Sequence, residues 1–252
     1  MSPTSSYSCP DPDFTVRSVP DNQLFPANRE VLAANSDVFR DMFSCCDNEG
    51  GDKNNYELEN NTLDLHETAT LTGALLSLIH ERPRIPVILK RSDPADGLLP
   101  KIIYDPSTVI PFPILSSLFS LADKYALSER ITDTLKTHLL AHASNHPLQV
   151  HGLALSLGLN EIASKSTQYM KPLAEYTQEE VKAIPSVSAY HSILQLQDFR
   201  VRSLRSILSE ENIFPHGYGS CSTHLEVTLS LWSSTKANLA SQIHHRTRKF
   251  LE

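Results

Sequence analysis

The sequence is poor in cysteine: its 252 residues include only four, Cys9, Cys45, Cys46 and Cys221. So few cysteines do not form the dense disulfide framework of small secreted domains, and they favour a reducing compartment. The first twelve residues have neither the basic start nor the apolar run of a signal peptide. We therefore expect residues 1–12 to be a disordered leader and the protein to be intracellular, in the cytoplasm or the nucleus.

Long apolar runs and basic clusters are also missing. No run of about 18 apolar residues is present to cross a membrane. The formal net charge is −7, which disfavours attraction to nucleic acid or to anionic lipid. The most basic stretch, residues 244–250, is typical of the solvated end of a helix, where cations complement the helix dipole. We expect no nucleic-acid partner and no membrane partner.

Motifs of enzymes are absent as well. The sequence has no Walker A motif, no dinucleotide-binding fingerprint and no HExxH. A nucleophile on a tight turn needs flanking glycines, and the nearest candidate, GYGSCS at 217–222, lacks the G-x-S-x-G pattern. We predict that the protein is not an enzyme and binds no cofactor. A hydrolytic enzyme on an atypical scaffold is the remote alternative.

Cysteine and histidine give two weak candidates for a metal site. Cys45 and Cys46 are adjacent, whereas structural zinc sites prefer cysteines separated by two to four residues. Cys221 and His224 have a better spacing but supply only one cysteine. We predict no metal site, and a metal-dependent enzyme remains a remote alternative.

The first half of the chain contains both strand and helix patterns. Apolar and polar residues alternate in 13–18, and VPDNQ supplies a turn before LFPAN at 24–28, which predicts a β-hairpin. Helical spacing then predicts two short helices, and Asn35 and Ser36 favour a break between them. Further along, we expect a polar loop at 45–55, a strand at 56–66, and a helix at 67–81 with Leu71, Leu75, Leu78 and Ile79 facing inward. The two short helices are expected at about 29–35 and 37–43.

The second half is helical after a proline-rich segment. Residues 82–111 are predicted to be a loop or insertion, with IPVIL and KIIY as short strands or apolar patches. Thr177 and Glu180 have the spacing of a capping box, which marks a helix start. The order of elements predicts an α+β domain followed by an all-α region. The expected helices are 112–127, 128–144, 147–159, 160–173, 177–185, 187–210 and, after a loop at 214–223, residues 224–250 with Leu225, Leu229, Trp232, Leu239 and Ile243 as its apolar stripe.

These blocks resemble the BTB/POZ family. The resemblance rests on S-x-x-F-x-x-M-F, made by Ser36, Phe39, Met42 and Phe43, and on A-D-K-Y-x-L at 122–127. With the order of the elements, it covers residues 13–143 and implies the BTB/POZ fold, a small sheet with α-helical hairpins. The charged FRDMF and the proline-rich insertion resemble BTB proteins of fungi.

The rest of the chain carries a fainter resemblance. Residues 144–210 resemble the helical BACK region that commonly follows a BTB domain, on the strength of repeated helix pairs beginning at H-G-LALSLGLNEIASKS. Residues 211–252 are expected to form a loop and a C-terminal amphipathic helix.

The resemblance implies protein–protein interaction as the function. BTB domains often form homodimers, and an aspartate of the first strand and a basic residue at the start of the first helix often share a pocket there. Asp13 and Arg29 stand at those positions. We expect a homodimer, or a heterodimer with another BTB protein, that recruits protein partners. A buried pair of opposite charge fixes register more readily than it adds stability.

The family resemblance also implies an alternative use. Some BTB proteins dock a cullin and serve as substrate adaptors of ubiquitin ligases, through an apolar residue and a glutamate just after the M-F. Counting from Phe43 places Asp47 at the apolar position and Glu49 at the glutamate. A charged Asp47 would not fill an apolar pocket, so this departure weighs against binding to a cullin.

Overall fold

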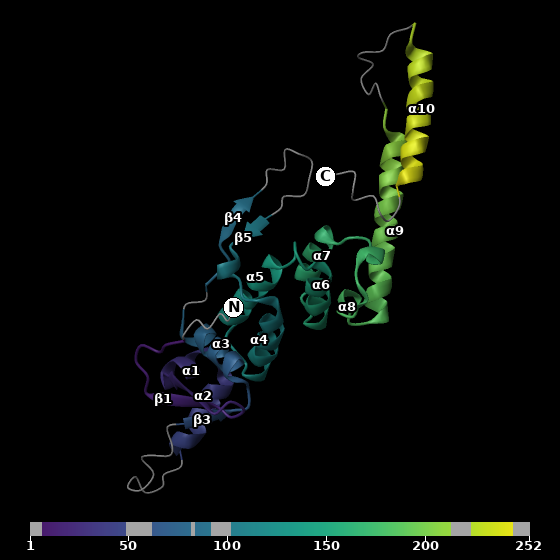
Figure 1. Cartoon of the computed structure of the whole chain (residues 1–252). Helices are drawn as coiled ribbons and strands as arrows, with labels where there is room; N and C mark the ends of the chain where they lie inside the picture. Colours follow the sequence, from purple (N-terminus) through teal and green to yellow (C-terminus); the bar gives the residue numbers. More distant parts are fainter. Residues whose placement is uncertain (1–6, 49–61, 82–83, 92–101, 213–222, 244–252) are drawn as a thin grey trace. The chain divides into compact units, whose positions relative to one another are not determined.

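The computed structural model describes residues 7–48, 62–81, 84–91, 102–212 and 223–243 (Figure 1). The chain divides into two compact units. The first comprises residues 1–93 and 100–144, and the second comprises 94–99 and 145–252. In the described part of the chain, no helix is both long enough and apolar enough to cross a membrane.

A three-stranded sheet with the order β2-β1-β3 forms one layer of the first unit. Strands β1 (Phe14–Ser18) and β2 (Gln23–Ala27) are antiparallel, which confirms the predicted hairpin. Strand β3 (Thr62–Leu65) pairs with β1 in parallel. The predicted strand at 56–66 is thus present in its second half, and residues 56–61 lie outside the described part.

The two faces of this sheet differ in burial. Successive side chains of a strand point to opposite faces. One face is apolar and buried, and it includes Val16, Phe25, Ala27 and Leu65. The other face, which we call the open sheet face, carries side chains that are exposed or half-buried: Thr15, Arg17, Leu24, Pro26, Thr62 and Asp64.

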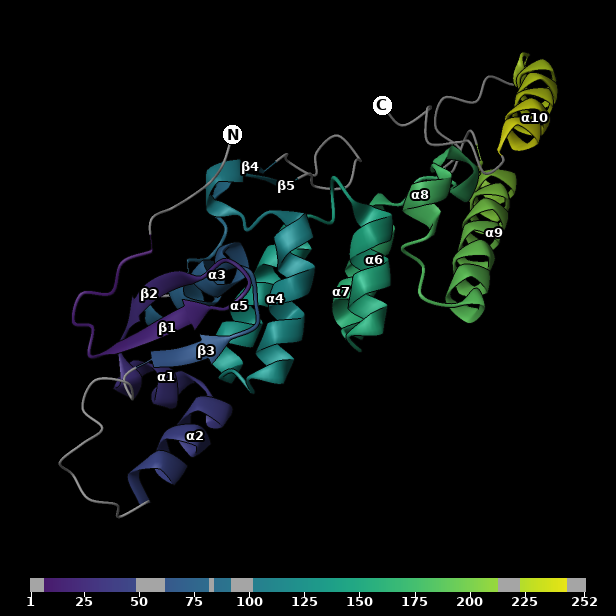
Figure 2. The ribbon, with the colours of Figure 1, turned by 60° about the horizontal axis from the view of Figure 1, so that its bottom comes forward.

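Helices cover the buried face, and Figure 2 shows α3, α4 and α5 behind the strands. The predicted pair of short helices is confirmed, because Ser36 has an extended backbone between α1 and α2. The second helix is longer than expected: it continues to Asn48, so the predicted loop at 45–55 is wrong at its start. Residues 37–49 contain no proline or glycine that would end the helix earlier. The helices are α1 (Arg29–Asn35), α2 (Asp37–Asn48), α3 (Ala69–His80), α4 (Phe112–Lys124) and α5 (Glu129–Ala141).

The inward face of α3 differs from the prediction. Leu71 and Leu78 were expected inside but are only half-buried. The buried residues are Thr72, Leu75, Leu76 and Ile79, which have the i, i+3, i+4, i+7 spacing of one helical face. The prediction favoured the apolar Leu71 and Leu78 over the polar Thr72 as inward-facing residues. Thr72 can be buried because its hydroxyl donates a hydrogen bond to the Glu67 carbonyl.

The proline-rich segment forms a second, two-stranded sheet in its described part. Strands β4 (Ile88–Arg91) and β5 (Ile102–Tyr104) are antiparallel. The strand expected at KIIY is present, whereas the one expected at IPVIL begins only at Ile88 and continues to Arg91. Residues 92–101 between them lie outside the described part. A 3-10 turn, η2 (Pro106–Thr108), follows.

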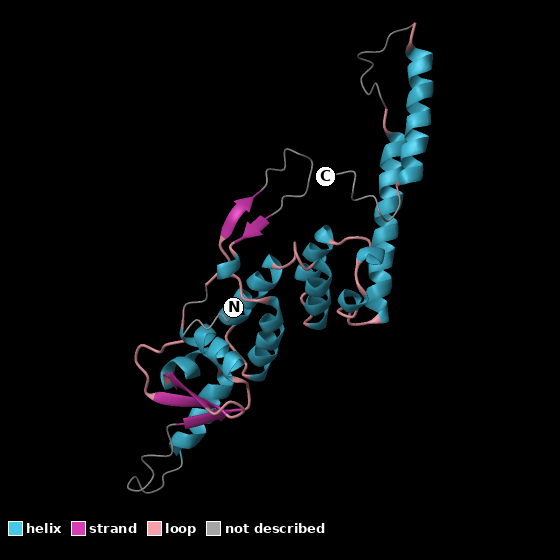
Figure 3. Ribbon diagram, viewed as in Figure 1, coloured by secondary structure: helices cyan, strands magenta, loops and turns pink. Residues whose placement is uncertain are grey.

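The described part of the second unit, from residue 145 onward, contains helices and loops but no strand (Figure 3). Its core includes Leu148, Met170, Leu173 and Ile193. The predicted helix at 160–173 is wrong beyond Ser166, where one 3-10 turn replaces it before Pro172. The elements are α6 (Pro147–Ser156), α7 (Asn160–Ser166), η3 (Thr167–Tyr169), η4 (Leu173–Glu175), α8 (Gln178–Val181), α9 (Val187–Glu210) and α10 (Leu225–Gln242).

Two local predictions in this unit are confirmed. Thr177 accepts a hydrogen bond from the Glu180 amide, and the Glu180 carboxylate accepts one from the Thr177 amide, so the capping box is complete. Helix α9 spans the predicted residues 187–210. The last helix ends at Gln242, and residues 244–250 of its predicted range lie outside the described part.

Candidate protein-interaction surface

Ser36 joins two parts of the first unit that are far apart in the sequence. It is 2% exposed, and its hydroxyl accepts a hydrogen bond from the Phe39 amide at the start of α2. The same hydroxyl donates to the Tyr125 carbonyl just after α4. The serine of S-x-x-F-x-x-M-F therefore links the first helical pair to the A-D-K-Y-x-L segment.

An aromatic stack continues from this link toward the sheet. The Phe39 ring is fully buried and stacks on Tyr125 with 4.9 Å between ring centroids. Phe43 follows at 6.5 Å from Phe39, and Phe14 of β1 meets Phe43 edge-on at 5.3 Å. Met42 points away from the stack and is 37% exposed. Phe39 and Phe43 are thus core residues, whereas Met42 is available at the surface.

The sequence analysis missed a buried carboxylate beside this stack. Glu67 is 9% exposed, and its two carboxylate oxygens accept hydrogen bonds from the Lys124 ammonium and the Tyr125 hydroxyl. Burial acts to raise the pKa of Glu67, but these two hydrogen bonds, the charge of Lys124 and a backbone hydrogen bond together outweigh it and hold that pKa below its usual value. The K-Y of the A-D-K-Y motif was visible in the sequence, but its distant partner was not.

Asp13 and Arg29 lie together at one corner of the sheet. The Asp13 carboxylate accepts a hydrogen bond of 2.8 Å from the backbone amide of Arg29, at the first residue of α1. The Arg29 guanidinium lies 4.7 Å from the Phe43 ring centroid and donates to the Phe43 carbonyl at 3.1 Å. Within one chain, Asp13 therefore contacts the Arg29 backbone, and the Arg29 side chain covers Phe43.

Asn28 caps the helix that Arg29 begins. Its side-chain oxygen accepts a hydrogen bond from the Val31 amide, as is typical of an asparagine just before a helix. The backbone amide of Asn28 donates to Nε2 of His80, and Nδ1 of His80 donates to the Leu76 carbonyl. Because both ring nitrogens are used in this way, His80 holds the start of α1 against the end of α3.

Of the residues expected at a cullin contact, the structure places only one side chain. Phe43 is 8% exposed and lies beneath Arg29, so it offers little surface to a partner. Asp47 belongs to α2, but its side chain is outside the described part, and so is all of Glu49. Met42 is an exposed apolar residue of this helix.

The open sheet face is a second surface that the sequence analysis did not single out. Arg17 and Asp64 are paired across β1 and β3, and the guanidinium makes two hydrogen bonds to the carboxylate. Beside them Leu24 of the outer strand β2 is 60% exposed. The alternation in DFTVRS placed Thr15 and Arg17 on one face and was the signal for this surface.

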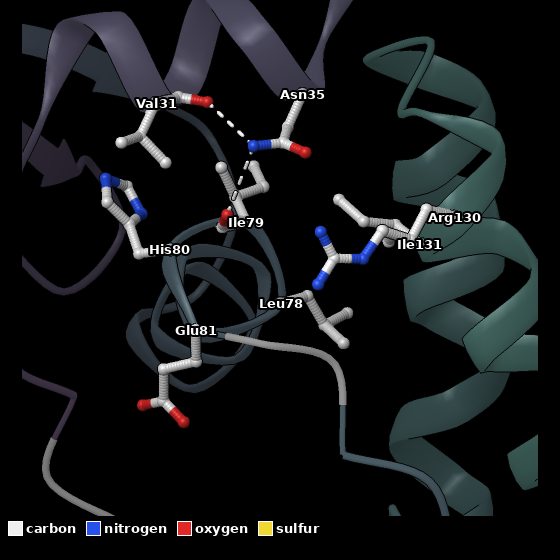
Figure 4. A pocket seen from close by; sticks show the side chains of 8 residues that line it. All are labelled: Val31, Asn35, Leu78, Ile79, His80, Glu81, Arg130 and Ile131. Carbon is white, nitrogen blue, oxygen red and sulfur yellow. Dashed lines mark hydrogen bonds between the residues drawn. The ribbon is translucent and has the colours of Figure 1, made fainter.

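One hollow among the described residues of the first unit is too small to suggest a substrate site. Figure 4 shows it between α1, α3 and α5, where the Asn35 amide donates to the carbonyls of Val31 and Ile79. Its volume of about 160 Å³ is below the roughly 300–1,000 Å³ of most small-molecule sites. Residues that line it include Arg130 and Glu81.

The described residues also do not assemble a metal site. No three His, Cys, Asp or Glu side chains among them are grouped so that they could hold a metal ion. Cys45 is exposed, and Cys221 lies outside the described part. His224 stands just before α10.

Comparison with known proteins bears on the first unit alone. Residues 11–80 match the model of the BTB/POZ domain family. A search of curated proteins finds no match to the chain. The matched segment contains the sheet, the α1–α2 pair and α3, with Asp13, Arg29 and the S-x-x-F-x-x-M-F residues. BTB domains are generally protein–protein interaction modules and are typically not enzymes. Residues 11–80 of this chain are therefore a BTB/POZ domain, and an all-helical region follows at the C-terminal end.

Proposed function

We propose that this chain is a non-enzymatic interaction module that dimerises through its BTB domain and recruits protein partners. The observation that carries the proposal is the BTB/POZ match over residues 11–80. Asp13, Arg29 and the open sheet face all belong to that segment. The dimer is a homodimer or a heterodimer with another BTB protein, in the cytoplasm or the nucleus, and the proposal includes no nucleic-acid, membrane or cofactor binding.

The proposed dimer surface combines the Asp13–Arg29 corner with the open sheet face. Leu24 is 60% exposed on the outer strand of the sheet, where a solvated leucine gains free energy by burial in an interface. The Arg17–Asp64 pair next to it supplies charges that favour one register of a partner over others. Asp13 and Arg29 extend the same surface to the start of α1.

Light scattering of the purified full chain, coupled to size exclusion, tests this proposal. We expect the mass of a dimer at micromolar concentration, and a shift toward the monomer for Leu24→Asp, because a charge at this exposed position is buried only in the dimer. Val187→Asp is the matched control, since Val187 is 85% exposed at the start of α9. A monomer at every concentration, or equal effects of the two substitutions, would contradict the proposed dimer.

The wider domain assignments belong to the same proposal. We extend the BTB domain to residues 13–143, with 82–111 as an insertion of the kind found in fungal BTB proteins. Residues 144–210 are assigned to a BACK-like region, and residues 211–252 to a loop and C-terminal helix. Helix pairs such as α6 with α7 support the BACK-like assignment.

A substrate adaptor of a cullin-based ubiquitin ligase is the alternative function. Met42, 37% exposed on α2, is the apolar residue that a cullin would meet there, whereas Phe43 is buried. A pull-down with the N-terminal domain of a purified cullin separates the two functions. Asp47→Leu should strengthen any binding by supplying the apolar residue, and Asp41→Leu on the same helix is the control. Absence of binding by the wild-type chain and by Asp47→Leu would exclude the adaptor function.

A further inference from the structure

The hairpin of β4 and β5 has little packing of its own against the first unit. It belongs to a segment, residues 84–91 and 102–110, that we call the insertion arm. Within this described part of the arm only Pro86 is buried, and every residue of β4 is exposed. A two-stranded hairpin alone is marginally stable in water. The position of the arm therefore depends on the bonds at its base.

Backbone bonds join the start of the arm to its end. The Asp105 amide donates to the Val87 carbonyl at 2.8 Å, and the Val87 amide donates to the Thr108 hydroxyl at 3.0 Å. The Asp105 carboxylate accepts a hydrogen bond from the Ser107 amide and so fixes the turn η2 between them. Because these bonds hold the two ends of the arm together, both ends reach the same place on α5.

His138 of α5 bridges the two ends. Its side chain is almost fully buried, at 2% exposure for the residue. Nδ1 accepts a hydrogen bond of 3.2 Å from the Ile110 amide, and Nε2 donates one of 2.8 Å to the Arg84 carbonyl. Only a neutral imidazole that carries its proton on Nε2 can make both bonds. One ring in one protonation state thus ties the start and the end of the arm to α5.

Protonation of His138 breaks this bridge. An imidazolium carries a proton on each nitrogen and accepts no hydrogen bond. The new proton on Nδ1 would point at the Ile110 amide proton, and the positive charge would be buried away from water. A buried charge without a partner is costly. The ring can return to water only when residues 84 and 110 move away from α5.

His142, one turn further along α5, responds differently. Its Nε2 donates to the Ile110 carbonyl at 2.8 Å, and its ring meets Phe112 edge-on at 5.5 Å. A protonated His142 still donates to that carbonyl, so this bond survives acidification. The charge of His142 also acts against a proton on His138 and lowers the pKa of His138. His138 is therefore the residue of the pair whose bonds depend on pH.

Other charged side chains around His138 pair with one another or lie at a distant helix end. The Arg84 guanidinium pairs with Glu81 at the surface, and residues 109–111 carry no charge. Among the described residues, His142 is the one whose charge acts on the pKa of His138, so no carboxylate there stabilises a proton on the ring. The remaining charged residues of the adjoining helices are Asp123 and Lys124 at the end of α4, Glu129 and Arg130 at the start of α5, and the surface pair Asp133 and Lys136.

We propose that His138 is a pH-sensitive clamp, which holds the insertion arm on α5 while the ring is neutral and releases it when Nδ1 takes up a proton, with the rest of the first unit still folded. Histidine suits this role because its ordinary pKa, about 6.5, lies near neutrality. The closed arm holds that pKa down. Below both pKa values, each pKa unit of this difference makes opening of the arm tenfold more favourable.

Hydrogen–deuterium exchange of the full chain between about pH 7.5 and pH 5.5 tests the clamp, with rates corrected for the intrinsic dependence of exchange on pH. We expect peptides covering residues 84–91 and 102–110 to exchange about fivefold faster or more at the lower pH. A peptide within α4, which packs in the core of the same unit, should keep its protection. Equal protection of the arm at every pH, or a parallel loss in α4, would overturn a local release.

His138→Gln separates the clamp from other effects of acid. Glutamine can still donate to the Arg84 carbonyl but takes up no proton, so exchange of the arm should no longer depend on pH. His191→Gln, on the exposed surface of α9, is the control and should respond as the wild-type chain does. A response of the arm in His138→Gln equal to that of the wild type would refute the clamp.

His142→Gln is a second variant that tests the clamp even if His138→Gln does not fold. Its arm should still be released by acid, because the bond that breaks belongs to His138. The release should begin at a higher pH, because the charge that opposes a proton on His138 has been removed. Exchange of the arm that is independent of pH in His142→Gln would assign the response to His142 and overturn the proposal.

Discussion

Single buried polar side chains connect distant parts of the first unit. Ser36, Glu67 and His138 are each at most 9% exposed, and each has partners far away in the sequence. Removing one partner of such a bond leaves the other buried without water, which costs more than the bond itself contributes. These residues are therefore where substitutions should act most strongly on stability.

Ser36→Ala removes the cap of α2 and the hydrogen bond to Tyr125 together. We expect the free energy of unfolding to fall by about 1–3 kcal/mol, because a cap and a buried acceptor are lost together. Urea denaturation of the full chain measures this free energy of unfolding. Ser120→Ala is the control, since the exposed Ser120 hydroxyl only bonds back to Ser116 within α4. A change within about 0.5 kcal/mol for Ser36→Ala, as for ordinary surface sites, would contradict this role.

His138 should make stability depend on pH. Its Nδ1 accepts a hydrogen bond from the Ile110 amide and its Nε2 donates to the Arg84 carbonyl, so the ring is neutral. Burial lowers the pKa of His138, and neighbouring His142 adds to this, whereas the Arg84 carbonyl opposes it. The stabilisation that the neutral His138 gives to the folded state is therefore fully present above the unfolded pKa of about 6.5. It is lost as the pH falls through the lower folded pKa.

Urea midpoints between about pH 7.5 and pH 5.5 measure this effect, above the range in which most carboxylates titrate. We expect the midpoint to decrease on acidification, and His138→Gln to weaken that dependence. The half-buried His80 has a pKa lowered chiefly by burial and acts in the same direction, so some dependence should remain. His191→Gln, on the exposed surface of α9, should change nothing. An unchanged slope in His138→Gln would refute the assignment.

At the scale of elements, helix contacts in the second unit depend on a close approach at Gly152 of α6. A Cβ added there would lie 1.9 Å from the Ala183 carbonyl oxygen, which belongs to the backbone just after α8. Backbone cannot give way as a flexible side chain can. The approach therefore requires glycine at this position.

Gly152→Ala should separate α6 from the segment after α8 and lower the free energy of unfolding by about 1–3 kcal/mol or more. Thermal and urea unfolding of the full chain measure the loss. Gly73→Ala is the matched control in α3, because its added Cβ would meet only the Phe25 ring at an ordinary 3.4 Å. Equal stability of the two variants would show that the close contact can relax without cost.

Elements of this chain could be predicted where the signal is local. The Thr177–Glu180 capping box and the limits of α9 depend on neighbours in the sequence, and both were predicted correctly. Positions that depend on distant partners were not: Glu67 is buried beside Tyr125, and Gly152 lies against the Ala183 backbone. The site followed the same division. Ser36 and Phe39 were read from their motif, whereas the Lys124–Glu67 bond and the open sheet face needed the fold.

At the scale of the whole molecule, the open sheet face is the surface proposed to bring two copies of the chain together. This face belongs to the BTB domain in the first unit. Substitution on this face should therefore weaken the dimer.

Hydrogen–deuterium exchange of the full chain across a dilution series tests the central claim, dimerisation through the BTB domain, most directly. Each peptide is followed from a concentration at which the dimer dominates to one at which it dissociates. The account predicts that peptides covering residues 13–30, which hold β1, β2 and the start of α1, are protected at high concentration and lose that protection on dilution. Exchange of residues 13–30 that is the same at every concentration, while light scattering reports a dimer, would contradict it.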